Sequence, residues 1–236
     1  MTGTGEARTI HGSSTDVPAY LADTYWWAYV HPRAVYVFER QWLVNLILWG
    51  NFNRLRDAAI DALGERVQGR TLQIACVYGD LTRRLLGRLD EKAELDVVDI
   101  LPIQLGNLER KLPADKRVTL FQGDSSALQF ASGSYDQALL FFLLHEQPED
   151  VRKATIAEAL RVVKPGGQLV IVDYHKPSKL SPLYWPMKGI LHTLEPYALD
   201  LWKHDLEGWL PHDVRISELR KETMFGGLYQ MLRITV

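Results

Sequence analysis

The stretch TLQIACVYGDLTRRLL, residues 71–86, decides the fold of this chain. Alternate apolar residues up to Cys76 predict a strand, Tyr78 to Asp80 predict a tight turn, and leucines at helical spacing predict a helix. A turn that enters a helix presents unpaired N–H groups above the strand end, where open α/β sheets hold nucleotide-like ligands. The stretch has one glycine and lacks a G-x-G-x-x-G phosphate loop, so an ordinary strand–helix unit of a core is the alternative interpretation.

Later apolar runs predict the rest of an α/β domain. Four further strands are expected at residues 95–99, 118–122, 135–144 and 168–173, with a helix at 150–163 that the breaker Lys164-Pro165-Gly166-Gly167 closes. Beyond Pro177, prolines 182, 186 and 196 interrupt an aromatic segment, and a helix at 199–210 and two strands at 214–219 and 228–236 complete the chain. The alternation predicts a Rossmann-like, mostly parallel sheet of seven strands with helices on both faces.

The segment before this domain is rich in aromatic residues. Val35, Phe38, Trp42, Leu46 and Trp49 recur every three or four residues, which predicts one helix with a single apolar stripe. Such a stripe forms part of the core, a lid over an apolar ligand, or a surface that touches a membrane. We therefore expect a flexible N-terminus at 1–19, a helical substrate-capping segment at 20–66 and a ligand-binding α/β domain at 67–236.

Composition limits the class of protein. The chain has 236 residues, of which 47% are hydrophobic and 24% charged, and this balance is typical of a globular protein. Its net charge of −2 provides no general attraction to nucleic acid. The single cysteine, Cys76, indicates a reducing, cytoplasmic setting and is expected to be a small buried hydrophobe. No apolar run approaches the roughly 18 residues needed to span a bilayer, and the first 18 residues lack the features of a signal peptide.

The order of these landmarks resembles the class I S-adenosylmethionine-dependent methyltransferases, and more narrowly those of quinone biosynthesis. The motifs that carry this resemblance are IACVYGDLT (74–82), VVDI (97–100), FQGDSSALQFASGSYD (121–136), ALRVVKPGGQLVIVDYHKP (159–177) and ETMFGGLYQMLRI (222–234). The resemblance implies S-adenosylmethionine as cofactor, with Asp99 accepting hydrogen bonds from the ribose hydroxyls and Asp124 accepting one from the adenine amino group. The cofactor-binding residues it implies are Gln73, Ala75, Cys76, Val77, Tyr78, Gly79, Asp99, Ile100, Asp124, Ser125 and Phe141.

Three departures from the methyltransferase pattern fall in the first motif. Gln73 stands where an acid is usual, Val77 replaces the first glycine of the turn, and Tyr78 replaces a small residue close to the expected sulfonium.

The motif VYGDL (77–81), together with WWAYVHPRAV (26–35) and FERQWLVNLILWGNF (38–52), resembles the rhodoquinone biosynthesis family RquA. That resemblance implies conversion of ubiquinone to rhodoquinone, in which an amino group from S-adenosylmethionine replaces a ring methoxy group with the assistance of Mn²⁺.

Such a reaction makes three demands on a site: a proton acceptor for the amino group, a surface that holds the ring, and a group that stabilises charge on the quinone oxygen. His145 and Glu146 follow the fourth strand, and Asp173 and His175 follow the fifth, so all four are expected at one sheet edge. We expect His145 and Asp173 to ligate the metal or transfer protons, with Glu146 and His175 as further ligands. Capping and partly exposed polar residues are the alternative. Tyr78 is expected to orient the cofactor or the quinone, or else to fill space.

The aromatic segment and residues 182–196 are natural covers for an apolar quinone. Because a long isoprenoid tail is insoluble, we expect peripheral contact with the inner face of the membrane, and whether Trp26 and Trp27 contact lipid is left open. Two rival functions remain, a methyltransferase acting on a quinone or phenol and a binding protein without activity. The sequence does not fix the oligomeric state.

Overall fold

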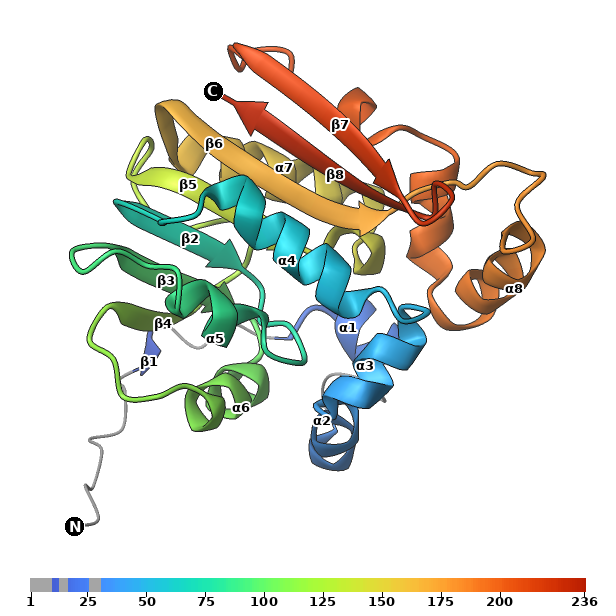
Figure 1. The fold of residues 1–236 in the computed structure, drawn as a ribbon, viewed down its shortest axis with the longest axis horizontal. Helices are drawn as coiled ribbons and strands as arrows, with labels where there is room; N and C mark the ends of the chain where they lie inside the picture. Colours follow the sequence, from blue (N-terminus) through green and yellow to red (C-terminus); the bar gives the residue numbers. More distant parts are fainter. Residues whose placement is uncertain (1–9, 13–16, 26–30) are drawn as a thin grey trace.

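The computed structural model describes residues 10–12, 17–25 and 31–236, and it has one mixed sheet with helices on both faces (Figure 1). The eight strands are β1 (Ile10–His11), β2 (Arg70–Ile74), β3 (Glu94–Asp99), β4 (Val118–Gln122), β5 (Tyr135–Phe141), β6 (Val163–Tyr174), β7 (Glu218–Met224) and β8 (Tyr229–Thr235). Their order is β1-β4-β3-β2-β5-β6-β8-β7. Among the described strands, β8 pairs antiparallel with β6 and β7, and the other pairs are parallel. The predicted Rossmann-like fold is therefore confirmed, with the short β1 added to the seven expected strands.

The central strands form the core because both of their faces are covered. Leu72, Ile74, Leu139, Leu140 and Val170 on β2, β5 and β6 have no exposed surface, as expected for parallel strands between helical layers. Helix α4 (Phe52–Leu63) crosses one face of the sheet, and α7 (Glu149–Val162) lies behind the other (Figure 1). Each large apolar side chain that is fully buried in these layers contributes about 1.5–3 kcal/mol.

The remaining helices connect the strands or gather beyond their C-terminal ends (Figure 1). They are α1 (Ala19–Thr24), α2 (Pro32–Phe38), α3 (Gln41–Ile47), α5 (Leu81–Leu86), α6 (Pro102–Lys111) and α8 (Tyr184–Leu194), with the 3₁₀ helices η2 (Leu144–Glu146), η3 (Pro196–Trp202) and η4 (Leu206–Trp209). The strands predicted at 95–99 and 118–122 and the helix predicted at 150–163 are confirmed within one residue at each end. The strand predicted within 135–144 is also confirmed, and it ends at Phe141. The predicted strand at 168–173 lies inside the longer β6.

The predicted aromatic helix is wrong in its continuity. Two helices, α2 and α3, occupy the segment, and the chain turns between them at Glu39 and Arg40. This turn moves the apolar stripe off a single face, so that Val35 is buried whereas Trp42 and Leu46 are mostly exposed.

The chain after β6 also differs from the prediction. The helix expected at 199–210 is replaced by η3 and η4, and a regular helix, α8, precedes them. Pro186 is tolerated in α8 because it lies in the first turn, where backbone N–H groups have no intrahelical partner. The strand expected at 214–219 begins only at Glu218, since Val214 and Ile216 pack against the core from a loop.

The division of the chain at residues 19 and 66 stays a prediction. The flexible N-terminus predicted at 1–19 falls largely outside the described residues, as do Trp26 and Trp27. No helix in the described ranges is both long and apolar enough to cross a membrane.

Candidate functional site

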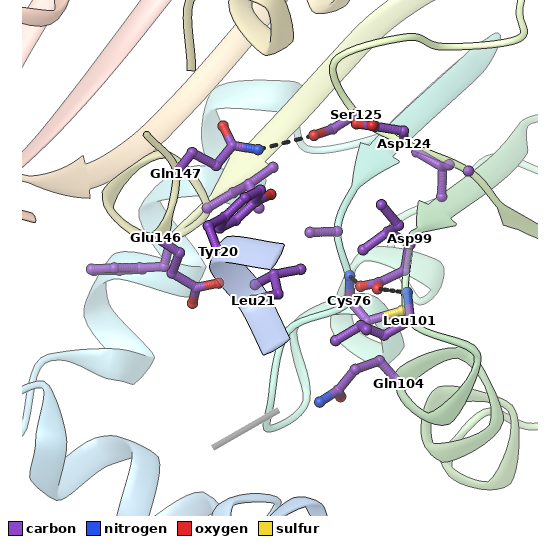
Figure 2. A pocket seen from close by; sticks show the side chains of 16 residues that line it. Tyr20, Leu21, Cys76, Asp99, Leu101, Gln104, Asp124, Ser125, Glu146 and Gln147 are labelled. Atoms are coloured by element: carbon purple, nitrogen blue, oxygen red, sulfur yellow. Dashed lines mark hydrogen bonds between the residues drawn. The ribbon is translucent and has the colours of Figure 1, made fainter. Parts of the chain in front are cut away.

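A polar cavity lies over the C-terminal ends of β2, β3, β4 and β5 (Figure 2). Parallel strands end at the same edge of a sheet, so segments far apart in sequence meet there. The side chains that carry its polar character come from five segments of the chain and are Tyr20, Asp99, Gln104, Asp124, Ser125, Glu146 and Gln147.

Asp99, the last residue of β3, anchors the loop that follows β2. Its Oδ2 accepts a hydrogen bond from the backbone N–H of Cys76 (2.6 Å), and its Oδ1 accepts one from Leu101 (2.8 Å). Each oxygen keeps a second lone pair that can accept from a ligand hydroxyl. Burial raises the pKa of this carboxyl to about 6, although the two N–H groups favour the charged form. Asp99 is therefore ionised at neutral pH, and a ligand with paired hydroxyls would stabilise that charge.

Asp124 and Ser125 form the neighbouring wall after β4. The Oδ1 of Asp124 accepts from both the backbone N–H (2.8 Å) and the hydroxyl (2.7 Å) of Ser126. Gln147 donates from Nε2 to the Ser125 hydroxyl (3.0 Å) and thereby links the segments after β4 and β5 (Figure 2).

Helix α1 occupies much of this cavity. Tyr20 and Leu21 lie between Glu146 and Gln147 on one side and Cys76 and Asp99 on the other (Figure 2). Burial, and then the nearby carboxylate of Glu146, raise the pKa of the Tyr20 phenol. The remaining free volume is about 60 Å³, whereas sites for small molecules usually have about 300–1,000 Å³. A ligand of nucleoside size therefore requires α1 to move outward.

A second cavity of about 360 Å³ adjoins the first and is mostly apolar. It lies between α3 and α8, and the two cavities share Cys76, Phe142 and Glu146 as walls. Phe142 has φ +53°, a conformation that costs a residue with a side chain about 1–2 kcal/mol. Its ring packs edge-on against His145, Tyr174 and Phe141, so the strain is maintained at the boundary between the cavities.

The apolar cavity has one polar end. His145 Nδ1 lies 3.0 Å from Asp173 Oδ1, and His145 Nε2 lies 3.6 Å from Glu146 Oε1. Burial lowers the pKa of His145, but Asp173, Glu146 and Glu195 outweigh it and raise the pKa to about 9. A charged imidazolium at neutral pH thus faces a cavity lined mainly by aliphatic and aromatic side chains.

Glu195 completes this polar end from the corner between α8 and η3. Its Oε2 is enclosed. Burial raises the pKa of its carboxyl, whereas the charge of His145 and a hydrogen bond with the Tyr25 side chain lower it. The carboxyl can therefore exchange a hydrogen bond or a proton with a ligand in the apolar cavity.

Tyr78 lies in the wall of the apolar cavity rather than in the polar one. Its phenol oxygen accepts a hydrogen bond from Gln104 Nε2 (2.8 Å), and Gln104 lines the polar cavity. The ring of Phe38 stacks on Tyr78 at 6.0 Å between ring centres. Tyr78 therefore stands between the two cavities.

The loop around Tyr78 is fixed by charged side chains and by close packing. Lys111 Nζ donates to the carbonyls of Val77 (3.4 Å) and Gly79 (3.0 Å) and pairs with Glu39 Oε1 (2.7 Å), which also accepts from Gly79 N–H. Gly79 has φ +87°, and a Cβ at this position would lie 2.7 Å from the Phe52 ring. Both the conformation and the close contact require glycine.

Residues 71–167 match a family model described as a methyltransferase domain. In this domain the chain is similar to the class I S-adenosylmethionine-dependent methyltransferases. It is 27% identical over 209 residues to an uncharacterized methyltransferase of Synechocystis sp., covering 88% of this chain and 93% of that protein. It is 33% identical over 141 residues to the ubiquinone/menaquinone biosynthesis C-methyltransferase UbiE of Dinoroseobacter shibae, covering 56% of this chain and 53% of that protein. This chain thus aligns with about half the length of that relative.

Solved methyltransferase structures share the fold. A SAM-dependent methyltransferase from Aquifex aeolicus superposes with a TM-score of 0.55 at 15% identity, covering 86% of this chain and 97% of that one. Human N-acetylserotonin methyltransferase, solved in complex with SAM, gives a TM-score of 0.64 at 13% identity, covering 93% of this chain and 60% of that one.

The positions of the predicted cofactor residues can be compared with this methyltransferase fold. Ala75, Cys76, Asp99, Ile100, Asp124 and Ser125 line the polar cavity. Val77, Tyr78 and Phe141 do not, because they line the apolar cavity, and Gly79 lines a separate pocket with Asp80 and Lys111. Gln73 is buried beneath the loop, where Oε1 accepts from Thr82 and Nε2 donates to the Ala75 carbonyl. Direct cofactor contact by Gln73, Val77, Tyr78, Gly79 and Phe141 stays a prediction.

The predicted metal ligands do not fit a metal ion. Both oxygens of Asp173 are already engaged, by the backbone N–H groups of Leu144 and Tyr174 and by the His145 ring. The ring of His175 contacts the Gly227 carbonyl instead (2.7 Å). In the described part of the chain no three His, Cys, Asp or Glu residues are grouped so that they could hold a metal ion. Among the residues that the structure describes, none therefore form a site for the expected Mn²⁺.

Several residues of the site carried no sequence signal. Tyr20 and Gln104 enter the polar cavity, and Glu195 enters the apolar one, from segments outside the recognisable motifs. By contrast, Gln147 could have been predicted as a site residue, since it directly follows the predicted residues His145 and Glu146.

Proposed function

We propose that the protein uses S-adenosylmethionine to modify the ring of a quinone, with the cofactor beside Asp99 and Asp124 and the quinone in the apolar cavity. One observation carries this proposal. The polar cavity at the strand ends and the apolar cavity share the walls Cys76, Phe142 and Glu146. A cofactor in one and a ring in the other would therefore meet at that boundary, which is the proximity that a group transfer needs.

The residues of the polar cavity suit this cofactor. Asp99 offers lone pairs for two ribose hydroxyls. Asp124 accepts the two hydrogen bonds from Ser126 at Oδ1, so Oδ2 can accept one from the adenine amino group. The names of curated relatives support a quinone, because UbiE is a ubiquinone/menaquinone biosynthesis methyltransferase and another relative, from Beutenbergia cavernae, is a demethylmenaquinone methyltransferase.

More specifically, we propose that the reaction converts ubiquinone to rhodoquinone by exchanging a ring methoxy group for an amino group. The support is the resemblance of residues 26–52 and 77–81 to the rhodoquinone biosynthesis family and the bulk of Tyr78 at the cavity boundary. S-adenosylmethionine, when bound, would supply the nitrogen: its Cα–N bond would break and a ring C–N bond would form, while the methoxy group leaves the ring as methanol. No step is assigned to Mn²⁺, because the residues present do not form a site for it.

The polar end of the apolar cavity then has defined tasks. His145, charged at neutral pH, donates a hydrogen bond to the quinone oxygen as negative charge develops there. Asp173 orients the His145 ring through Nδ1. Glu146, which lines both cavities, accepts a proton at their boundary.

Methylation of a quinone or phenol is the second candidate function. The family model and the names of the relatives favour it. It uses the same two cavities and differs in which group is transferred. A binding protein without activity is a third possibility that the same experiment addresses.

The test follows two labels through one incubation. S-adenosylmethionine labelled with carbon-13 at the methyl group and nitrogen-15 at the α-amino group is incubated with the enzyme and a short-tailed ubiquinone, and the quinones are analysed by mass spectrometry. Nitrogen-15 in the product together with released methanol is the expected result. Carbon-13 in the product would instead establish methylation, and cofactor binding without any product would establish a binding protein.

Replacing Tyr78 with Phe separates the first two functions further. The change removes the acceptor of the Gln104 hydrogen bond and keeps the ring. We expect amination to fall and cofactor affinity to stay the same, whereas a methyltransferase would be little affected.

We further propose a cytoplasmic protein at the inner face of the membrane, where a long-tailed quinone is available.

A further inference from the structure

Two helices that are far apart in sequence expose apolar side chains on either side of the apolar cavity. Trp42 and Leu46 on α3 are 62% and 65% exposed, and Trp185 on α8 is 68% exposed. We use the name portal surface for six exposed apolar residues of these helices, which are Trp42, Leu46, Ile47, Trp185, Ile190 and Leu194. Exposure of several large apolar side chains together usually marks an interaction site.

The portal surface is continuous with the apolar cavity. Ile47 on one helix and Ile190 and Leu194 on the other belong to the surface and also line the cavity. The Nε1 of Trp49, just after α3, lies 2.9 Å from the sulfur of Met187 on α8, so the two helices are in contact beside the opening. An apolar ligand in the cavity can therefore extend between α3 and α8 onto the portal surface.

The two chain segments that carry the portal surface are rich in cations. Residues 31–51 and 174–194 contain five Lys or Arg residues and one acid, in a chain whose net charge is −2. The five cations, Arg33, Arg40, Lys176, Lys179 and Lys188, are all exposed. The acid, Glu39, is already paired with Lys111, and the Lys188 ammonium lies 5.5 Å from the ring centre of Trp185.

We propose that the portal surface docks on an anionic lipid bilayer and that a long-tailed substrate reaches the apolar cavity from the bilayer between α3 and α8. Exposed Trp beside Lys suits the boundary between headgroups and acyl chains, where the ring is partly buried and the cation meets phosphate. Each basic residue close to such a surface strengthens the attraction to anionic lipid. The proposal rests on the proposed function for the identity of the tail-bearing substrate, whereas the docking itself rests on the surface alone.

The experiment measures binding of the full-length protein to vesicles. Sedimentation with vesicles of phosphatidylcholine containing phosphatidylglycerol is compared with vesicles of phosphatidylcholine alone, at low and at high salt. We expect binding to the anionic vesicles that weakens with salt. The triple variant Trp42→Glu, Leu46→Glu, Trp185→Glu, which changes no residue that lines either cavity, is expected to lower the partition coefficient at least tenfold.

The control is Leu219→Glu, an exposed leucine on β7 that is 37% exposed and lies outside α3 and α8. It should bind vesicles like the unaltered protein. Equal binding by the triple variant, or failure of the unaltered protein to bind anionic vesicles at low salt, overturns the proposal. So does a dimer in solution that the triple variant converts to a monomer, because a second copy would then cover the portal surface.

Turnover distinguishes this proposal from the proposed function. The triple variant should process a water-soluble, short-tailed quinone as fast as the unaltered protein and lose activity only on a long-tailed quinone in vesicles. If no quinone is a substrate, the proposed function fails while the vesicle measurement still decides the docking. Loss of both activities in parallel by a folded triple variant would contradict a role limited to docking.

Discussion

Replacing Asp99 with Asn tests the cofactor site most directly. The buried carboxylate accepts one backbone N–H at each oxygen, from Cys76 and Leu101. Asn has nearly the same shape, keeps one acceptor and carries no charge. The exchange should therefore preserve the loop and remove the charge that paired ribose hydroxyls would stabilise.

The expected effect on affinity is large. A hydrogen bond to a charged group contributes about 1.5–3 kcal/mol and a neutral one about 1 kcal/mol. Losing two charged acceptors and retaining one neutral acceptor costs about 2–5 kcal/mol, which is about a 30- to 5,000-fold weaker affinity for S-adenosylmethionine. Because the pKa of Asp99 is about 6 in the folded protein without ligand, affinity of the unaltered protein should also weaken as the pH falls below about 6.

The effect on stability has the opposite direction. The pKa of Asp99 rises from 3.8 to about 6 on folding, so the folded state binds this proton more tightly than the unfolded state. Its contribution therefore disfavours folding by about 3 kcal/mol once the pH has risen through about 6. Asn removes this cost but leaves one N–H without an acceptor, at about 1–3 kcal/mol. The unfolding free energy at pH 7 should change by no more than about 2 kcal/mol.

Calorimetric titration with S-adenosylhomocysteine between pH 5 and 8, combined with urea unfolding, measures both quantities. Asp124→Asn is the matched control, since one oxygen of Asp124 is held by Ser126 and the pH dependence near 6 should persist in that variant. Unchanged affinity in Asp99→Asn, or a pH dependence near 6 that survives the substitution, would refute the placement of the cofactor beside Asp99.

Three further predictions concern other parts of the site. In Gly79→Ala the alanine must adopt a left-handed conformation, and its Cβ would lie 2.7 Å from the Phe52 ring. The substitution should therefore lower the free energy of unfolding, measured in urea, by about 2–4 kcal/mol. An unchanged midpoint of the urea transition would contradict the close packing. Turnover should fall as the pH rises through about 9, because His145 then loses its proton. The ion pairs of His145 add stability that is fully present below about pH 6.5, and this stability should be lost as the pH rises through about 9. A rate that rises above pH 9 would assign His145 as a base. Tyr20→Ala should speed cofactor association at least several-fold in stopped-flow fluorescence by freeing space in the polar cavity, and a slower association would show that Tyr20 holds the ligand instead.

The parallel part of the fold was predictable because its signals are local. Strands buried on both faces are apolar runs bounded by turns, so residues 95–99, 118–122 and 135–144 located β3, β4 and β5 correctly. The edge strand β7 has the sequence ELRKETM and is mostly exposed, so it carried no apolar pattern, and the prediction moved to Val214 and Ile216 nearby.

The site was predictable only where residues follow strand ends. Asp99, Asp124 and the pair His145 and Asp173 lie at the expected edge, because parallel topology brings strand ends together. Position in a motif did not reveal side-chain direction. Tyr78 belongs to a motif that surrounds a cofactor, yet here it lines the apolar cavity. Tyr20 and Glu195 arrive from helices whose docking depends on tertiary packing, which no local pattern records.

The charged His145 imidazole could meet the same chemical requirement as a metal ion. A quinone oxygen that gains negative charge needs a cation nearby, and His145 is a cation whose position the core fixes. The buried guanidinium of Arg152 donates to the carbonyls of Leu144 (2.8 Å) and Gln147 (2.7 Å), the residues on either side of His145 and Glu146. It also donates to the Tyr197 carbonyl (3.0 Å), two residues beyond Glu195. The buried Arg152 side chain thus holds both segments that form the polar end of the apolar cavity. The His145 imidazolium and the carboxyls of Glu146 and Glu195 therefore keep their relative positions without a metal ion.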